Sequence, residues 1–283
     1  MSKGKLFVCA TPIGNLKDIT FRVLETLKEV DLIAAEDTRQ TRKLLTHYGI
    51  KTPLTSYHEH NEITRGKELL RKLEGGQDIA LVSDAGMPGL ADPGHRLIKA
   101  CLEAGIGVEV LPGPSAFLTA LVISGLPTDS FIYRGFLPRK RGERLRALKE
   151  LSDEKRTLVF YESPHRIEDL LVDALEVLGD RGMVLVRELT KKFEEVIRGS
   201  ISQVLERIRE RKLKGEMVVV MEGAEEKRSL ADIGSLDSRV IWLMKEGFTR
   251  REAVKKIAEE EGVSPRMLYE AVKRVKISRE KDD

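Results

Sequence analysis

The sequence predicts an α/β protein with two α/β domains followed by a small helical domain. Three observations support this prediction. Between residues 5 and 124, short apolar runs alternate with stretches of helical periodicity, which is typical of a doubly wound parallel sheet. Between residues 131 and 221, similar runs recur with more mixed spacing, which indicates a sheet that contains antiparallel pairs. Beyond residue 238, the pattern is helical.

The composition sets the class of protein. Of the 283 residues, 41% are hydrophobic, which is enough for a sizeable core, and no apolar run is long enough to cross a membrane. The net charge of +3 gives no general attraction to nucleic acid, so such binding must rest on local basic patches. Cys9 and Cys101 lie in apolar surroundings and are expected to be buried free thiols. The first residues show no signal-peptide pattern, so we expect a soluble, cytoplasmic protein.

The expected organisation is two α/β domains at residues 1–125 and 126–223, a charged linker at 224–238, and a helical domain at 239–283. In the first domain, the strands are short apolar runs that end in polar or glycine-rich sequence, and the helices repeat apolar residues every three or four positions. The expected strands are Lys5–Ala10, Leu32–Ala35, Pro53–Ser56, Ile79–Val82 and Val108–Leu111. The expected helices are Thr20–Val30, Thr38–Tyr48, Glu62–Leu73, Gly94–Ala104 and one capped by Ser115 that ends at Ser124.

The second domain and the tail follow from the same reasoning. The expected strands are Phe131–Phe136, Thr157–Tyr161, Met183–Glu188 and Met217–Met221, with Lys192–Gly199 as a further candidate. The expected helices are Arg139–Leu151, one that ends at Leu178, and Ile201–Arg211, followed in the tail by Arg239–Lys245, Thr249–Glu261 and Pro265–Val275. Three short helices with tight turns resemble a helix-turn-helix, but they are also typical of a helical dimerisation or packing appendage.

All five strands expected in the first domain end in loops that carry ligand-type groups, namely TPIGN, EDTR, YHEHN, SDAGMPG and PGPS. Because parallel strands end at one edge of a sheet, these loops are expected to lie together, and ligands bind at that edge. Glycines allow backbone NH groups to approach a ligand closely. Polar loops and helix caps occur in any α/β fold, so one loop alone indicates little, whereas all five together favour a binding site.

Several well-known catalytic motifs are missing from the sequence. It contains no Walker A motif, no GxGxxG after the first strand, no nucleophile elbow and no zinc motif. His58 and His60 are two residues apart in a loop, an arrangement that more often makes local hydrogen bonds than binds metal. We therefore expect neither a nucleotide triphosphatase nor a common dinucleotide enzyme, and no metal site.

Taken together, the loop motifs resemble the tetrapyrrole-methylase superfamily of S-adenosylmethionine-dependent methyltransferases. The segments that carry the resemblance are Thr11–Asn15, Glu36–Arg39, Ser83–Gly94, Pro112–Ala116, Glu162–Arg166, Arg187–Lys191 and Lys214–Glu216. The resemblance covers residues 5–222, and the tail from Arg239 is similar to the helical domain of the branch that methylates a cytidine ribose 2′-oxygen of 16S rRNA. Met87 departs from the pattern, which has threonine there.

The resemblance implies that S-adenosylmethionine binds in a cleft between the two α/β domains. From the first domain, the implied contacts are Pro12, Ser83, Asp84, Ala85, Gly86, Met87, Pro112, Ser115 and Ala116. From the second domain, they are Tyr161, Leu189, Gly215, Glu216 and Met217. Backbone NH groups around Gly86 and at the start of the helix after Ser115 are the donors expected to bind the carboxylate of the cofactor. A homodimer is also implied.

Methyl transfer to an alcohol requires in-line placement of the oxygen and removal of its proton. The candidates for the base are Glu36, Asp37 and His58, with Asn15 and Arg39 orienting the nucleotide, and the sequence does not choose between them.

The expected partner is 16S rRNA in the small ribosomal subunit. The basic residues expected to contact its phosphates are Arg139, Lys140, Arg141 and Arg144 near the domain junction, and Arg250, Lys255, Lys256 and Arg266 in the tail. Two alternatives remain open: an acceptor that is a tetrapyrrole precursor or a modified protein histidine, and a non-catalytic RNA-binding protein. The basic segment counts against the first alternative, and the five loops count against the second.

Overall fold

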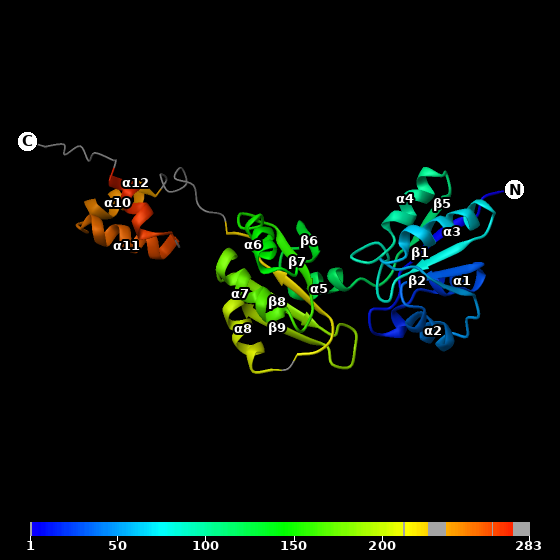
Figure 1. Cartoon of the computed structure of the whole chain (residues 1–283). Coiled ribbons are helices and arrows are strands. Elements are labelled where there is room, and N and C mark those ends of the chain that lie inside the picture. Colours follow the sequence, from blue (N-terminus) through cyan, green and yellow to red (C-terminus); the bar gives the residue numbers. More distant parts are fainter. Residues whose placement is uncertain (1, 212, 226–235, 262, 274–283) are drawn as a thin grey trace, which may run out of the picture. The chain divides into compact units, whose positions relative to one another are not determined.

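The computed structural model describes residues 2–211, 213–225, 236–261 and 263–273 (Figure 1). Contacts divide the chain into two compact units, Met1–Ala224 and Glu225–Asp283. The first unit contains two five-stranded sheets, and the second unit contains helices. Most of the expected linker, residues 226–235, lies outside the described residues.

The first sheet is parallel throughout, as predicted, with the strand order β3-β2-β4-β1-β5. Its strands are β1 (Lys5–Cys9), β2 (Leu32–Ala35), β3 (Leu54–Ser56), β4 (Ile79–Val82) and β5 (Gly107–Leu111). The segments between them form the short 3-10 helix η1 (Leu16–Asp18) and the helices α1 (Phe21–Glu29), α2 (Thr38–His47), α3 (Glu62–Glu74) and α4 (His95–Glu103). Each strand therefore runs in the same direction and ends at the same edge.

Burial on both faces explains why these strands are apolar throughout. All four residues of β4 are buried, and their side chains alternate between two cores. Leu81 packs with Leu69 of α3 on one face, while Val82 packs with Leu27 of α1 on the other. A parallel sheet covered by helices on both sides requires this near-continuous apolar pattern.

The second sheet is mixed, with the order β6-β7-β10-β8-β9. Its strands are β6 (Phe131–Phe136), β7 (Thr157–Glu162), β8 (Gly182–Arg187), β9 (Glu195–Ser200) and β10 (Met217–Met221). Only β6 and β7 pair in parallel, which confirms the predicted antiparallel pairs, and the candidate strand at Lys192–Gly199 is β9. Helices α6 (Arg141–Lys149), α7 (Ile167–Leu178) and α8 (Ile201–Arg209) follow in the same half of the chain.

Helix α5 (Ala116–Ser124) packs on the second sheet although it directly follows the last strand of the first. Its residues Ala120 and Leu121 share a core with Val159 of β7 and Val218 of β10. The chain thus passes to the second sheet before residue 125, which is the predicted end of the first domain.

In the described part of the second unit, helices α10 (Asp237–Lys245), α11 (Arg250–Glu261) and α12 (Pro265–Lys273) pack around a small apolar core. The predicted capping box is present, because the Glu252 NH donates to Thr249 Oγ1 and the Thr249 NH donates to Glu252 Oε2. The predicted end of the third helix at Val275 lies outside the described residues. Both cysteines are buried and free, as expected. Among the described residues, no helix is long and apolar enough to cross a membrane.

A buried ion pair joins α6 to α7. The Arg144 Nη2 atom lies 2.7 Å from Asp173 Oδ2, and the two side chains are only 4% and 2% exposed. The Arg141 Nε atom also lies 2.9 Å from Asp173 Oδ1, from the solvent side. This placement corrects the expectation that Arg144 contacts a phosphate, because its guanidinium is inside the protein and already paired.

Replacing Asp173 by alanine would leave the buried charge of Arg144 without this partner. We expect the free energy of unfolding to fall by about 3–5 kcal/mol, measured by urea denaturation. The double variant Arg144→Met/Asp173→Leu, which removes both charges, should recover most of that loss. A double variant as unstable as the single one would contradict this account.

Candidate functional site

The loops that follow β1 and β4 are joined by a short two-residue bridge. The Thr11 NH donates to the Gly86 carbonyl at 2.8 Å, and the Gly86 NH donates to the Thr11 carbonyl at 3.0 Å. Gly86 has a φ of 84°, a conformation that favours glycine. The buried Thr11 hydroxyl also donates to the Ser83 carbonyl at 3.0 Å. The Gly86 NH is therefore used within the protein, so it is not one of the free donors expected around Gly86; the expectation for the neighbouring NH groups stays a prediction.

A chain of carboxylate–backbone hydrogen bonds links the loops after β2 and β4. Glu36 Oε2 accepts from the Asp84 NH at 3.2 Å, and Asp84 Oδ1 accepts from the Asp37 NH at 3.0 Å. Burial raises the pKa of Glu36 and that of Asp84 above their usual values, although these hydrogen bonds oppose the effect. The two carboxyl groups are thus fixed in place by the backbone of the neighbouring loop.

Asp37 and Arg39 form a separate pair at the start of α2. Asp37 caps the helix by accepting from the Arg39 NH at 2.8 Å, and the Arg39 guanidinium lies 2.7 Å from its other oxygen. The Arg39 side chain holds the pKa of Asp37 at about 2, so this carboxyl is a poor proton acceptor near neutrality. Neither residue lines the cavity described below.

Asn15 and His58, two further candidates, make local contacts. The Asn15 side chain caps η1 by accepting from the Lys17 NH, and its own NH donates to Thr190 Oγ1 at 2.9 Å. The His58 ring lies against Asn61, with the two nitrogens 3.1 Å apart. These side chains do not line the cavity either. Of the five predicted catalytic residues, the cavity includes Glu36.

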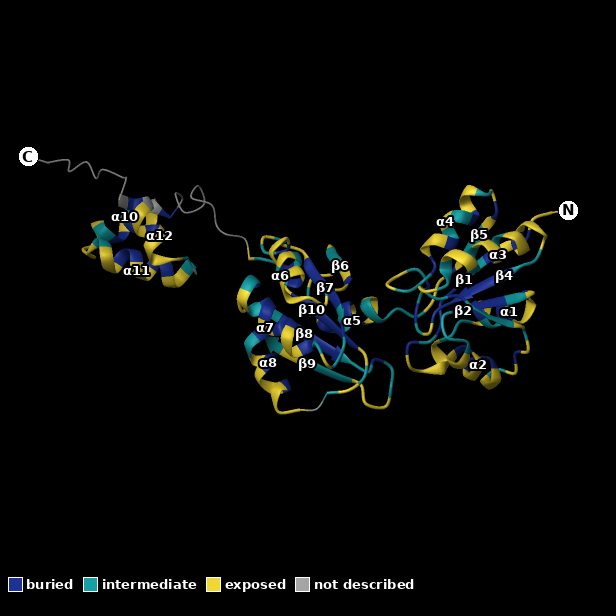
Figure 2. Ribbon diagram, in the orientation of Figure 1, coloured by how far each residue is buried: buried dark blue, intermediate teal, exposed yellow. Residues whose placement is uncertain are grey.

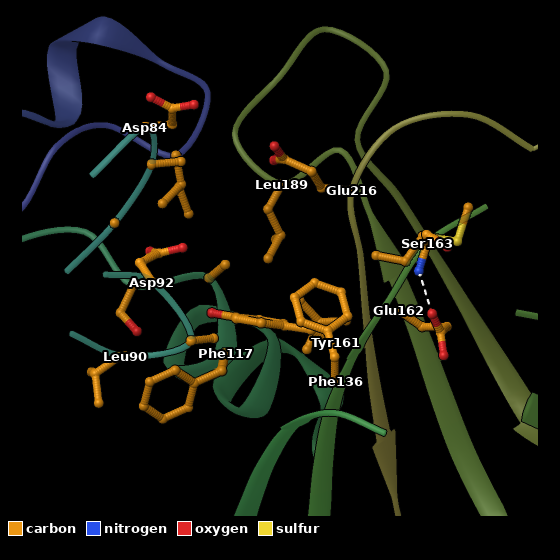
Figure 3. Close-up of a pocket in the computed structure, with 18 of the residues that line it drawn as sticks. Asp84, Leu90, Asp92, Phe117, Phe136, Tyr161, Glu162, Ser163, Leu189 and Glu216 are labelled. Atoms are coloured by element: carbon orange, nitrogen blue, oxygen red, sulfur yellow. Dashed lines mark hydrogen bonds between the residues drawn. The ribbon is translucent and has the colours of Figure 1, made fainter. Parts of the chain in front are cut away.

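A cavity of about 330 Å³ is formed by residues that follow strands of both sheets. Figure 3 shows Asp84, Leu90 and Asp92 from the loop after β4, with Tyr161 and Glu162 from the end of β7. The predicted cofactor residues that line it are Asp84, Ala85, Gly86, Met87, Ser115, Ala116, Tyr161, Leu189, Gly215, Glu216 and Met217. Pro12, Ser83 and Pro112 do not line it. The volume and the mixed lining are typical of small-molecule sites.

The cavity lining is rich in carboxyl groups, although Lys191 pairs with Glu216 and Arg166 pairs with Glu162 from outside it. Five carboxyl groups line it, those of Glu36, Asp84, Asp92, Glu162 and Glu216, and none of the described residues that line it is a lysine or arginine. Burial, with the nearby charge of Glu36, raises the pKa of Asp92 from 3.8 to about 7, although a hydrogen bond from Ser83 opposes the shift. A low-dielectric cavity with this lining favours a cationic ligand.

Aromatic side chains also line the cavity. Phe136 and Tyr161 have ring centroids 5.6 Å apart, and Phe136 is 54% exposed. The Tyr161 hydroxyl makes a hydrogen bond with the backbone of Phe117, which also lines the cavity at the first turn of α5. A flat ring system has apolar and aromatic surface to contact here. Ser115 makes no side-chain cap to α5, so its side chain leaves the NH groups of the first turn uncapped where Ser115, Ala116 and Phe117 line the cavity.

Two loops of the second sheet hold Leu189 against the cavity. The flanking residues Glu188 and Thr190 have φ values of 51° and 63°, which are unusual for residues other than glycine. The loops are joined because the Glu216 NH donates to Glu188 Oε1 at 3.2 Å and Lys191 Nζ lies 3.2 Å from Glu216 Oε2. Gly215, with a φ of 87°, has no room for a Cβ atom, which would lie 2.0 Å from Glu188 Oε1.

Several lining residues were not predicted. They are Ile13, Leu90, Ala91, Asp92, Phe117, Phe136, Glu162, Ser163, Pro164, Val186 and Val218. A signal existed for the residues inside motifs already singled out, such as Asp92 in SDAGMPGLADPG and Glu162 directly after the expected strand Thr157–Tyr161. Phe117 and Phe136 gave no signal, because an aromatic residue within an apolar run is indistinguishable from a core residue.

The predicted RNA-binding residues are distributed over both units. Arg139, Lys140 and Arg141 are exposed near the start of α6, with Arg141 paired to Asp173 and Glu176. In the second unit, Lys255 and Arg266 line an open hollow together with Arg251 and Tyr269. Lys256 Nζ lies 5.2 Å from the ring centroid of Phe248, and Arg250 is half-buried. Among the described residues, no cluster of three or more histidine, cysteine or acidic side chains could hold a metal ion.

Comparison with known proteins places the chain among methyltransferases. A profile of the tetrapyrrole (corrin/porphyrin) methylases matches residues 5–205. The "Ribosomal RNA small subunit methyltransferase I" of Halalkalibacterium halodurans is 48% identical over 275 residues, which cover 94% of both chains. The protein of the same name from Escherichia coli O157:H7 is 48% identical over 271 residues, 95% of this chain and 94% of that one. The crystal structure of the methyltransferase CobJ has a TM-score of 0.60 at 20% identity, covering 80% of this chain and 97% of that one, and this likeness shows a shared fold.

The raised pKa of Asp92 predicts a pH-dependent stability gain for Asp92→Asn. Well below pH 3.8 the carboxyl is neutral in both folded and unfolded chains. As the pH rises from 3.8 to about 7 the unfolded chain loses this proton first, so the cost to folding grows and is complete above about pH 7. We therefore expect the variant to be more stable than the parent by about 1–2 kcal/mol at pH 8, allowing for solvent screening, with the gain vanishing towards pH 4.

The matched control for this measurement is a variant whose stability should change in the opposite direction. Asp37→Asn removes a carboxyl whose pKa is lowered to about 2 by Arg39, so it should be less stable than the parent at pH 8. Thermal or urea unfolding at pH 4, 6 and 8 measures both variants. An Asp92→Asn gain that does not change with pH would contradict the assignment.

Proposed function

The chain belongs to the family of tetrapyrrole (corrin/porphyrin) methylases, and from this membership we propose that it methylates 16S rRNA of the small ribosomal subunit with S-adenosylmethionine as the donor. The acceptor is the ribose 2′-oxygen of a cytidine. The observation that carries the proposal is the near-50% identity, over almost the whole chain, to proteins named for methylation of small-subunit ribosomal RNA. Homodimer formation and a cytoplasmic location stay predictions.

The cavity suits this cofactor chemically. S-adenosylmethionine supplies a methyl group activated by the positive charge of its sulfur. The five lining carboxyl groups favour a cation, and they can also accept hydrogen bonds from ribose hydroxyls. The Tyr161 and Phe136 rings offer a surface for the adenine. The first turn of α5 after Ser115 offers NH donors for a carboxylate.

The chain's contribution to catalysis is binding, placement and proton removal. Placement of two reactants accounts for about 7–11 kcal/mol of a barrier in favourable cases. Glu36 is our candidate for the residue that takes the proton of the acceptor hydroxyl, because it lines the cavity and burial raises its pKa towards the working range of a base. Its hydrogen bond to the Asp84 NH holds the carboxyl in position. Asp37 and His58 are outside the cavity, so we assign them supporting roles.

The affinity for S-adenosylmethionine should depend on pH, because its positively charged sulfur is attracted by the carboxylates that line the cavity. Asp92 gains its negative charge as the pH rises through about 7, so S-adenosylmethionine should bind about 3–10-fold more tightly at pH 7.5 than at pH 6. S-adenosylhomocysteine has a neutral sulfur and should show a smaller change. Titration calorimetry at the two pH values measures both ligands, and equal changes for the two would contradict a role for the acidic lining.

The function itself is tested with small ribosomal subunits that lack the methyl group. We expect transfer of labelled methyl to the 16S rRNA, and recovery of 2′-O-methylcytidine after nuclease digestion. Glu36→Gln should lower kcat by about 10²–10⁴-fold with little change in cofactor affinity, because only proton removal is lost. A Glu36→Gln enzyme of near-parental kcat would contradict the assignment of the base.

A second acceptor class serves as the negative control. Labelled methyl appearing in uroporphyrinogen, with none in the ribosomal subunits, would overturn the proposed acceptor while leaving the family assignment intact. Failure of the protein to bind S-adenosylmethionine at millimolar concentration would overturn the cofactor as well.

A further inference from the structure

Helix α2 has an unusual charge pattern. Its sequence, TRQTRKLLTH, contains Arg39, Arg42 and Lys43 with His47 at the end, and it contains no acidic residue. Every other described α-helix that carries a lysine or arginine also carries aspartate or glutamate. In a chain with 46 acidic residues among 283, a ten-residue helix with only positive charges is a local excess.

The positive side chains lie on the side of α2 that faces solvent. Thr41, Leu44 and Leu45 are the buried residues of the helix, which leaves its outer surface to the polar ones (Figure 2). Residues three and four apart are neighbours on a helix, so the exposed side chains form one stripe. They line an open hollow composed of Thr38, Arg39, Arg42, Lys43, Thr46 and His47.

The charge of this stripe is only partly neutralised by the described residues, because Arg39 pairs with Asp37 whereas Arg42 and Lys43 do not pair. Some other arginines of the described chain, such as Arg22 and Arg65, pair with a carboxylate. Arg42 and Lys43 have no ion pair with any described residue, and Lys43 Nζ instead donates to the Gln40 amide oxygen at 2.9 Å. Two adjacent unpaired cations on a helix that carries no carboxylate are suited to an anionic partner.

The stripe begins next to the cavity. Asp37 caps α2, and its NH donates to Asp84, whose side chain lines the cavity. Glu36, the preceding residue, lines it as well. At a rise of 1.5 Å per residue, Arg42 is about 8 Å along the helix from this cap. An extended anion bound along α2 would therefore lead directly to the edge of the cavity.

We propose that the exposed face of α2 binds the phosphate backbone of the RNA strand that flanks the target nucleotide. This inference rests on the proposed function and assigns part of its substrate-binding surface. Arginine and lysine donate charge-assisted hydrogen bonds to phosphate oxygens, and such contacts fix the register of the RNA without reading its sequence. The stripe thereby holds the strand while one nucleoside enters the cavity.

The test compares two double variants with the same chemical change. Arg42→Gln/Lys43→Gln removes the two unpaired charges from the middle of the stripe. Arg71→Gln/Lys72→Gln is the matched control, because these residues are also adjacent, exposed and without an ion pair to any described residue. They lie near the end of α3, where the Leu73 carbonyl accepts from the Gly4 NH beside the start of β1, at the opposite edge of the sheet from the ligand loops.

Three measurements separate RNA binding from folding and from chemistry. Binding to unmethylated small ribosomal subunits is followed as a function of KCl concentration, KM and kcat are measured with the same subunits, and the Kd for S-adenosylmethionine serves as a check on the cavity. For Arg42→Gln/Lys43→Gln, we expect about tenfold weaker RNA binding at 0.1 M KCl, a salt slope reduced by about 1–2, and a higher KM with kcat retained. The Kd for S-adenosylmethionine should not change. The control variant should match the parent in every measurement.

The outcomes distinguish this inference from the proposed function. If the parent methylates the subunits but the two variants bind RNA equally well, the role of α2 is overturned and the function stands. If the parent binds S-adenosylmethionine but methylates no ribosomal subunit, the function is overturned, and an unchanged salt slope in the α2 variant would overturn the inference as well. A reduced slope confined to the α2 variant supports it.

Discussion

The bridge between Thr11 and Gly86 is the contact on which the site depends. The parallel pairing of β1 with β4 brings the two loops to one edge, and the paired hydrogen bonds of this bridge then fix their separation. Ser83 and Thr11 bury their polar groups around it, so the loop after β4 is held from two sides. Asp84, Met87 and the residues beyond them reach the cavity from that fixed base. Without it, a glycine-rich loop of this length would have too much conformational freedom to form a cavity wall.

The cavity and the outer face of α2 carry groups of opposite charge. Carboxyl groups gather inside the cavity, where burial strengthens their interaction with a cation. Unpaired basic groups lie outside it on α2, where they face water. The boundary between the two regions is the Asp37–Arg39 pair, in which a carboxylate caps the helix and an arginine neutralises it. A cationic cofactor and a polyanionic substrate could therefore approach the same loops without competing for the same groups.

Most of the fold could be predicted from the sequence, because short apolar runs buried on both faces leave a strong pattern. The predicted bounds of β2, β4 and β10 agree with the structure. Contacts between residues that are distant in the chain were harder to predict from the sequence. Arg144 looked like one more member of a basic run, and only the packing of α6 on α7 shows that Asp173 buries it. Similarly, the use of the Gly86 NH depends on a partner 75 residues away.

The position of α5 has a consequence for how the protein is made. This helix leaves the ribosome directly after β5, yet its apolar core partners in β7, β8 and β10 are synthesised later. The first sheet can fold as soon as its five strands have emerged, since domains form progressively from the amino end during translation. The Ala116–Phe117 wall of the cavity can take its place only once β10 is complete, so the cavity forms only after the last strand of the first unit has been synthesised.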